Sequence, residues 1–424
     1  MRVVVATTAL ALSVLSVRAQ ESGKGARERA DSARLAELER RVDALTRELE
    51  RVELGADVVQ AETPAMGLGP AAAKVYHVDR GVSIAGYGEV LYENFARELE
   101  DGRPASSADR FDALRAILYV GYKFSDRLLF NSEIEVEHAN EIALEFAYVD
   151  YKVSDAVGAR GGLLLVPMGL INELHEPPVF LGTERPVTES RIIPTTWREN
   201  GIGLFGEARG LSWRAYLMNS FDGTGFSAAG LRGGRQHGAK ARAEDLAAVG
   251  RLDWVGTPGL LAGGSAFYGH TGQGRTSDRG RVDGALFLWD LHLDYRHRGL
   301  DVRALVAGAE VRDPASLNEL SGLTGADAVG KTMLGWYVQG GYDVLRGVAT
   351  AHQLIPYVRY EEVDTQRRVA AGFSADPAND LTVVSIGVAW KPVRQVAAKL
   401  DYQFHSNRAN TGVNQWNAQL GWLF

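Results

Sequence analysis

The chain has 424 residues, no cysteine and a formal net charge of -7. The absence of cysteine excludes a disulfide scaffold and any thiolate metal site, and the mildly acidic balance argues against a nucleic-acid partner. The 48 glycines and 13 prolines, without a collagen period, are typical of a protein made of strands and tight turns.

The first nineteen residues are predicted to be a signal peptide, residues 1–19. Arg2 precedes an apolar run from Val3 to Val17, and Val17-Arg18-Ala19 offers small residues for cleavage. The run is short for a membrane-spanning helix, so a retained anchor is the weaker alternative. We therefore expect an exported protein.

Residues 28–54 are predicted to form a short α-helical coiled coil on the periplasmic side. The apolar residues follow a 3-4-3-4-3 spacing that marks the a and d positions of heptads. Three heptads leave a single amphipathic helix on a surface as an alternative, and the mixture of Leu and Val does not separate dimer from trimer. Residues 55–80, rich in Ala, Gly and Pro, are predicted to be a linker. The heptad positions are Leu35, Leu38, Val42, Leu45, Leu49 and Val52.

From residue 81 onward the hydrophobic period changes to two. In 394–406, apolar residues such as Leu400 and Phe404 alternate with Lys399, Asp401 and Gln403. A strand places successive side chains on opposite faces, whereas a helix does not produce this pattern. About sixteen such segments follow one another, with lengths near the 9–11 residues of tilted membrane strands.

The connections between these segments alternate between short turns and long polar loops. Short turns are expected at 125–126, 209–210, 257–259, 297–299 and 391–392, and long loops near 96–109, 220–245, 271–280, 313–330 and 365–379. This segregation is typical of outer-membrane barrels, whereas a soluble β-sandwich or soluble barrel does not need it. We therefore predict an all-β fold, a transmembrane antiparallel β-barrel of about sixteen strands over 81–424, in contact with membrane lipid in the bacterial outer membrane.

Two short strings imitate nucleotide-binding motifs. The string GADAVGKT, 325–332, matches a phosphate-binding loop, but no buried strand precedes it and an alternating strand follows it. The string GIGLFG, 201–206, matches a dinucleotide fingerprint but lacks its strand–turn–helix context. Both are interpreted as chance matches in a glycine-rich chain. No cofactor is expected, and no metal site is expected either.

A barrel of sixteen strands encloses water, so its polar faces are expected to line a pore. Each of these residues could equally be a solvated wall residue without a role in selectivity. No lumen residue is assigned in 145–153, where the alternation is ambiguous. The candidate pore-lining residues are Glu133, Glu135, Glu137, Arg214, Arg251, Arg303, Arg359, Lys399 and Asp401.

A long connection at about 167–198 is predicted to fold into the barrel as a constriction loop. It is stiffened by Pro177, Pro178, Pro186 and Pro194, and it carries many apolar residues. Its charges would set the electrostatic barrier of the pore. The alternative is a lid or a subunit contact outside the barrel. The candidate constriction residues are Glu173, Glu176, Glu184, Arg185, Glu189, Arg191 and Arg198.

The run PMGLINELHEPPVF, followed by IIPTTWRENGIGLFGE, resembles the phosphate-selective porin family (porin O/P type) over about 160–210. The resemblance implies a sixteen-stranded, trimeric outer-membrane porin. It does not carry phosphate over residue by residue, because no position matches a basic ladder and acidic residues are frequent along the expected pore.

The sequence thus predicts a porin for passive diffusion of small hydrophilic solutes or ions, including anions such as phosphate. The alternative is a tether or adhesin that grips the cell wall through the coil and whose pore is plugged. An enzyme is not expected, because G-x-S-x-G is absent and no histidine lies in a recognisable motif. The terminal Trp422 and Phe424 resemble the signal read by the outer-membrane assembly machinery.

Overall fold

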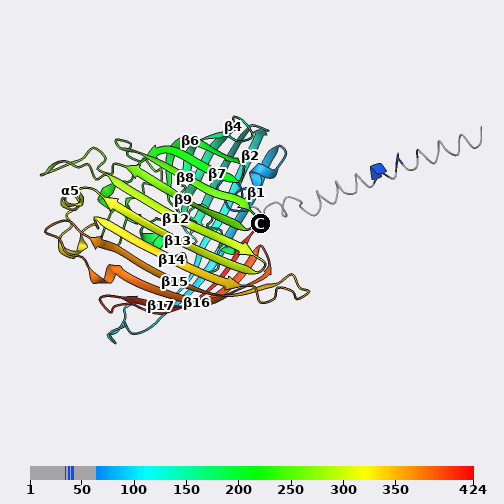
Figure 1. Ribbon diagram of the computed structural model, residues 1–424. Helices are drawn as coiled ribbons and strands as arrows, with labels where there is room; N and C mark the ends of the chain where they lie inside the picture. Colours follow the sequence, from blue (N-terminus) through cyan, green and yellow to red (C-terminus); the bar gives the residue numbers. More distant parts are fainter. Residues whose placement is uncertain (1–33, 35–36, 39, 43–63) are drawn as a thin grey trace, which may run out of the picture. The chain divides into compact units, whose positions relative to one another are not determined.

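The computed structural model describes residues 34, 37–38, 40–42 and 64–424. Sixteen strands form one closed antiparallel barrel in which every strand pairs with its neighbours along the chain, β9 being followed by β12 (Figure 1). The predicted fold class and strand number are confirmed. The barrel strands are β1 (Gly81–Phe95), β2 (Arg110–Ser125), β3 (Leu128–Glu137), β4 (Glu141–Lys152), β5 (Gly158–Leu165), β6 (Arg198–Ala208), β7 (Leu211–Asn219), β8 (Leu246–Thr257), β9 (Leu260–Gly269), β12 (Leu286–His297), β13 (Leu300–Val311), β14 (Thr332–Tyr342), β15 (Gln353–Arg368), β16 (Asp380–Val393), β17 (Val396–Asn407) and β18 (Gln415–Leu423).

The last strand closes the barrel against the first. In this pair Tyr87 lies opposite Leu423, and Phe95 lies opposite Gln415. Closure leaves no strand edge with unpaired backbone groups, which is the condition for a sheet to cross a hydrocarbon layer. Among the described residues, no helix is long and apolar enough to cross a membrane.

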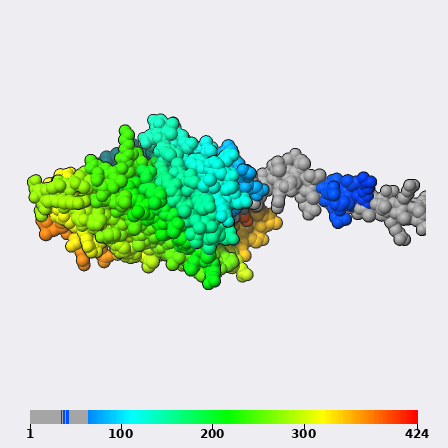
Figure 2. All heavy atoms as spheres, turned by 90° about the horizontal axis from the view of Figure 1, so that it is seen from above, coloured from blue at the N-terminus to red at the C-terminus, as the bar shows by residue number. Residues whose placement is uncertain are grey.

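The wall has an apolar outer face, and its inner face carries most of its charged side chains together with an apolar cluster that includes Leu288, Leu305 and Phe267. In β17, Lys399, Asp401 and Gln403 are buried inside, whereas Leu400 and Phe404 remain 47% and 46% exposed on the outside. Figure 2 shows one outer side of the wall, from the cyan to the green part of the chain, as a continuous surface. An inner face that carries the charges and an apolar exterior are the inverse of a soluble β-barrel, and they suit a lipid environment.

The two ends of the barrel differ, as the sequence predicts. One end, here called the turn end, carries 126–127, 153–157, 209–210, 258–259, 298–299, 343–352 and 394–395 and the end of β18 (right in Figure 1). The other, the loop end, carries the longer connections (left in Figure 1, marked by α5). These connections contain the short elements η2 (Gly223–Gly225), η3 (Arg232–Gly234), β10 (Thr276–Ser277), β11 (Gly280–Arg281), α5 (Pro314–Leu320), η4 (Gly325–Asp327) and η5 (Pro377–Asn379).

Some connections differ from the prediction. The expected turn at Lys391-Pro392 is wrong, because β16 continues to Val393 through a break in register and the turn lies at 394–395. Proline cannot donate to a ladder, so a β-bulge accommodates it and the sequence signal imitates a turn. The longest turn-end connection, 343–352, and the short loop-end connection, 138–140, were also not anticipated.

The chain divides into two units, 1–59 and 60–424. In the first unit the described residues Arg34, Glu37, Leu38 and 40–42 are helical, and Glu37 pairs with Arg41 at 3.1 Å. The whole predicted signal peptide, most of the predicted coiled coil and the first part of the predicted linker lie outside the described residues. These three predictions therefore stay predictions.

The second part of the predicted linker, 55–80, contains a buried segment. The segment 64–78, here called the N-terminal plug, lies within the second unit and includes the helix α3 (Lys74–His77). Leu68, Ala71, Ala73 and Val75 are at most 2% exposed and belong to the interior apolar cluster. The small side chains of this segment are buried against the inside of the barrel.

Candidate functional site

The interior of the barrel is occupied by the connection between β5 and β6, residues 166–197, here called the inner loop. It contains the short helices η1 (Pro177–Val179) and α4 (Thr188–Arg191) and is almost wholly buried. Trp197 is fully buried and stacks on Phe221 with 4.3 Å between ring centroids. The apolar residues that the sequence singled out thus form a packed core inside the barrel.

Glu189 joins the two halves of the inner loop and ties them to the wall. Its Oε2 accepts hydrogen bonds from the backbone N–H groups of Leu170 (2.6 Å) and Ile171 (2.7 Å), and its Oε1 accepts from the Tyr337 hydroxyl at 2.6 Å. Burial raises the pKa of Glu189 above its ordinary value. This carboxylate was expected to face the pore, but it is fully buried, so its role in the structure is to hold the loop.

Basic side chains of the wall hold successive carbonyl groups of the inner loop. Arg296 and Arg303 both donate to the carbonyl of Val179, at 2.8 and 2.7 Å. Lys391 donates to the carbonyl of Pro178 at 2.8 Å. The sequence did not single out Arg296 or Lys391, because each lies near a turn where strand alternation is hard to follow.

Two further basic residues continue this series. Lys399 donates to the carbonyl of Gly182 at 2.9 Å, and Arg359 donates to that of Glu184 at 3.2 Å. Asp401 accepts from the backbone N–H of Thr183 at 3.0 Å. The carbonyls of Pro178, Val179, Gly182 and Glu184 thereby accept from basic side chains. A hydrogen bond from a charged donor is stronger than one from a neutral donor. The wall from β12 to β17 therefore fixes the position of the loop from 178 to 184.

A second set of charges meets the inner loop on β7 and β8. Glu173 pairs with Arg214 at 3.0 Å and with Arg251 at 3.3 Å. Both arginines also pair with Asp253, at 3.1 and 2.8 Å. The structure brings these three sequence-predicted residues together, but as a neutralised buried network rather than as free charges facing water.

The remaining predicted residues have varied surroundings. Arg198 is the first residue of β6, not part of the loop, and pairs with Glu145 at 3.1 Å. Glu137 pairs with Arg115 at 3.4 Å. Glu184 accepts from Gln415 and Asn417, and Arg191 donates to Asn379 at 3.4 Å. Glu133 and Glu135 lie on β3 and are buried. Arg185 lies in the inner loop, and its guanidinium Nη2 is buried.

The chain terminus packs on the first strand. The backbone N–H of Phe424 donates to the carbonyl of Gly86 at 2.8 Å, and Gly86 donates back to Phe424 at 3.0 Å. The indole ring of Trp422 lies close to Gly88, where an added Cβ would stand 2.5 Å from it. A role of these two aromatic residues in assembly stays a prediction.

Glu176 holds the N-terminal plug in place. Its carboxylate accepts from the backbone N–H groups of Ala71 and Ala72, both at 3.0 Å, and burial raises its pKa to about 7. A Cβ on Gly69 would lie 2.6 Å from this carboxylate, so only glycine allows the approach. The constriction residue predicted from the sequence is therefore a bridge between the inner loop and the plug.

The plug is also fixed to the wall by hydrogen bonds that could not be predicted from the sequence. Tyr76 donates to Asp150 at 2.6 Å and accepts from Arg160 at 2.7 Å. Asn131 donates to the carbonyl of Ala72 at 3.0 Å. Glu176, Asp150, Arg160 and Asn131 thus hold the plug from different sides, and none of these four residues lies near it in sequence.

Replacing Glu176 by Ala should loosen the plug. The buried N–H groups of Ala71 and Ala72 would lose their shared acceptor, and leaving a buried donor unsatisfied costs about 1–3 kcal/mol. Because the natural chain has no cysteine, an Ala73→Cys reporter can be labelled alone with a hydrophilic maleimide. We expect labelling about tenfold faster in the Glu176→Ala background, whereas an exposed Arg209→Cys reporter should label equally in both; equal rates at position 73 would contradict the bridge.

Two cavities lie at the turn end beside the plug and the inner loop. One, of about 560 Å³, is lined by Pro64 and Val179 together with Arg296, Arg298, Lys391, Arg394, Asp301 and Asp343 among others. The other, of about 400 Å³, also reaches Pro64 and Val179 and is lined by Glu173, Arg214, Arg251 and Asp253 among others. Both cavities therefore border the two segments that fill the interior.

Comparison with solved structures identifies the architecture. Similar barrels are OmpF of Salmonella typhi in complex with daunomycin (TM-score 0.53, 12% identity, 82% of this chain and 98% of that chain) and the outer membrane channel DcaP of Acinetobacter baumannii (0.51, 12%, 81% and 97%). An anion-selective porin from Comamonas acidovorans is similar at TM-score 0.50 (12%, 81% and 99%). At such low identity these likenesses establish a porin-like barrel fold and nothing finer, so membership of the phosphate-selective family stays a prediction.

No protein-family model matches the chain. One curated relative, an uncharacterized protein of Aquifex aeolicus (strain VF5), is 39% identical over 381 residues, which cover 86% of this chain and 85% of the relative. Because the match covers 86% of this chain, it includes most of the barrel. The chain therefore belongs to the same family as this Aquifex aeolicus protein.

Proposed function

We propose that the protein is an outer-membrane porin that lets small hydrophilic solutes diffuse passively, without enzymatic activity. The observation that carries the proposal is a closed sixteen-strand barrel with an apolar outer face and a charged interior. Sixteen strands enclose more space than wall side chains alone can fill. The inner loop narrows this space, as a constriction does in a selective channel.

Small anions are the solute class that we propose, with phosphate as one member. The larger turn-end cavity is lined by Arg296, Arg298, Lys391 and Arg394 against Asp301 and Asp343. A cleft lined mainly by one sign of charge raises the local concentration of the opposite ion. This excess of basic groups supports anion preference at the periplasmic mouth.

A charge reversal in this cavity tests the anion preference. Arg298 and Arg209 each occupy an Arg-Gly turn with left-handed backbone (φ 50 and 52), and only Arg298 lines the cavity. Arg298→Glu should lower the ratio of anion to cation permeability about twofold or more, and Arg209→Glu should leave it unchanged. The ratio is obtained from chloride and potassium fluxes into liposomes of each variant; equal ratios in the two variants would contradict anion preference.

A cell-wall tether with a closed barrel is the second candidate. The observation in its favour is the N-terminal plug, which joins the interior of the barrel to the chain segment that carries the predicted coil. Deleting 28–54 should then abolish co-sedimentation with peptidoglycan. Unchanged co-sedimentation would remove this candidate.

The assembly state and biogenesis complete the proposal. We propose a homotrimer, brought together in part by the coil, and recognition of Trp422 and Phe424 by the outer-membrane assembly machinery. The apolar, lipid-facing strands support a membrane setting. Mass measurement of the detergent-solubilised protein checks the trimer, and a Phe424→Ser variant with reduced outer-membrane yield checks the signal.

A further inference from the structure

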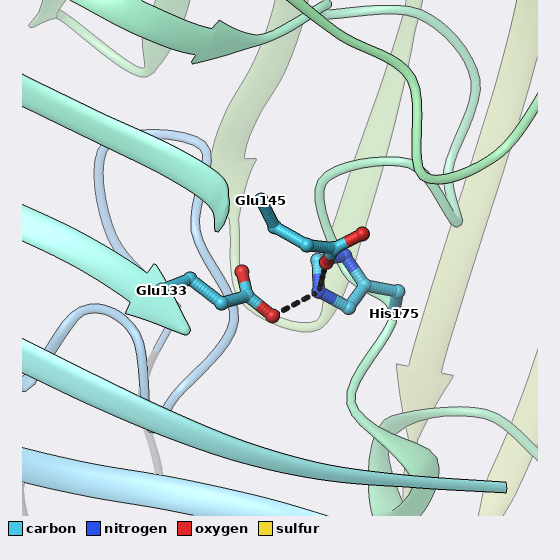
Figure 3. Close-up of side chains that lie close together, drawn as sticks. All are labelled: Glu133, Glu145 and His175. Atoms are coloured by element: carbon cyan, nitrogen blue, oxygen red, sulfur yellow. Dashed lines mark hydrogen bonds and ion pairs between the residues drawn. The ribbon is translucent and has the colours of Figure 1, made fainter. Parts of the chain in front are cut away.

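Three potential metal ligands meet where the inner loop touches the wall. His175 of the loop points its Nε2 at Glu133 Oε1 of β3 (3.3 Å) and at Glu145 Oε2 of β4 (3.4 Å), as Figure 3 shows. The three ligand atoms lie within 4.8 Å of one another. Both carboxylates are fully buried, and His175 is 2% exposed.

A β-bulge brings the second carboxylate into this cluster. The register between β3 and β4 shifts between Glu133 and Ile134, so that Glu145 is the extra residue on β4. As a result Glu145 and its neighbour Phe146 are both fully buried inside the barrel. Bulges commonly redirect a side chain toward a functional site, and this one explains why the alternation around 145–153 was ambiguous.

Other residues fix the orientation of the ligands. The carbonyl of Asn172 lies 3.1 Å from Nδ1 of His175, and Arg198 donates to the far oxygen of Glu145, Oε1, at 3.1 Å. Asn172 is itself held by bonds to the backbone of Val166 and Trp197. Metal-binding histidines and carboxylates usually have such outer partners, which set the tautomer and the direction of the free atom.

This arrangement leaves acceptors facing one another. A carbonyl can only accept, so Nδ1 of His175 carries the proton and Nε2 of the neutral ring presents a lone pair to two carboxylates. Glu133 Oε2 and Glu145 Oε2 have no hydrogen-bond donor among the described residues. Arg198 compensates the charge of Glu145 only at its other oxygen. A buried carboxylate oxygen that faces other acceptors is costly, so a positive species between these atoms would stabilise the cluster.

Two phenol groups beside the cluster also lack partners. Tyr119 lies opposite Glu133 on β2, and Tyr87 packs on the His175 ring at 5.8 Å between centroids. Both hydroxyl groups are buried without a hydrogen-bond partner in the described part of the chain. A water molecule bound to a metal would offer these hydroxyls a partner, which a bare proton would not.

We propose that Glu133, Glu145 and His175 bind a divalent transition-metal ion, Zn²⁺ by geometry, with water as the fourth ligand. Tetrahedral Zn²⁺ with bonds of about 2.0–2.1 Å holds its ligand atoms about 3.3–3.4 Å apart, close to the two distances observed here. Two carboxylates balance the charge of the ion, and an imidazole favours Zn²⁺ over Mg²⁺ or Ca²⁺. The ion would fasten the inner loop to β3 and β4, a role independent of the solute that the porin carries.

Zinc binding by the full-length, tag-free protein tests this site. Chelator-treated protein in detergent is titrated with Zn²⁺ by calorimetry, with Mg²⁺ as a second titrant. We expect one Zn²⁺ per chain, no comparable heat with Mg²⁺, and an X-ray absorption spectrum with N/O neighbours at about 2.0–2.1 Å. Glu133→Gln and His175→Gln should each weaken binding about 100-fold.

His292 provides a matched control. This buried histidine also lies between two carboxylates, Asp253 (2.8 Å) and Asp290 (2.5 Å), but each of its ring nitrogens faces its own carboxylate in direct hydrogen-bond contact, so it is already paired. His292→Gln should bind Zn²⁺ as the natural protein does. If His175→Gln does not fold, the isosteric Glu133→Gln carries the test. Absence of stoichiometric zinc binding by the folded natural protein, or equal affinity in Glu133→Gln, would overturn the proposal.

Discussion

Deleting the N-terminal plug, residues 64–78, is expected to raise the single-channel conductance of the protein about twofold or more, because conductance depends on the narrowest open section. The plug occupies the interior with side chains as buried as those of a protein core, Ala71 and Ala73 among them. Its removal leaves water in that space and solvates the polar groups, such as Asp150, that now bond to it.

The matched control is deletion of 28–54, which removes the predicted coil and leaves the plug. That variant should conduct as the natural protein does, in recordings of the two purified proteins under the same salt. Equal conductance in both deletion variants would show that the plug does not obstruct the path of ions.

Replacing Glu189 by Ala is the substitution from which we expect the largest loss of stability. The buried N–H groups of Leu170 and Ile171 and the Tyr337 hydroxyl would lose a shared charged acceptor. Leaving such donors unsatisfied costs about 1–3 kcal/mol each, so the free energy of unfolding should fall by about 3 kcal/mol or more. Urea unfolding followed by tryptophan fluorescence measures this change, since Trp197 lies in the core of the inner loop.

The conservative variant Glu189→Gln provides the comparison. Its amide oxygen can still accept hydrogen bonds while its charge is gone, so its stability should lie between those of the natural protein and Glu189→Ala. A Glu189→Ala protein within about 0.5 kcal/mol of the natural one, the range of ordinary surface substitutions, would show that the inner loop does not depend on this carboxylate.

The barrel was predictable because its pattern is local. Strand alternation, as at Leu400 and Asp401, follows from side chains pointing to opposite faces, and it survives in each segment separately. The prediction from strand alternation failed where the backbone departs from the regular hydrogen-bond pattern of the sheet. Pro392 lies in a strand with a register break, where its sequence signal imitates a turn. Glu145 lies in a bulge that makes the alternation ambiguous without showing which side chain turns inward.

The sequence predicts an inner loop inside the barrel, but it does not predict which partners the charged residues of this loop contact. Length, prolines and apolar residues placed the inner loop inside the barrel, whereas the roles of its charges depend on partners far along the chain. Glu176 meets Ala71 and Ala72, and Lys399 meets Gly182, across more than a hundred residues. Charges assigned to an electrostatic barrier are instead largely paired with wall or plug, as Glu173 is with Arg214 and Arg251.

We propose that this protein is a porin whose interior is narrowed by the inner loop and the N-terminal plug. Single-channel recording of the purified, heat-modifiable protein in a planar bilayer, with a salt gradient across it, tests that claim most directly. We expect stepwise openings, in groups of three for a trimer, and a reversal potential of the sign that indicates anion preference. Silence from the folded natural protein, persisting after deletion of 64–78, would contradict a channel and leave the tether as the remaining function.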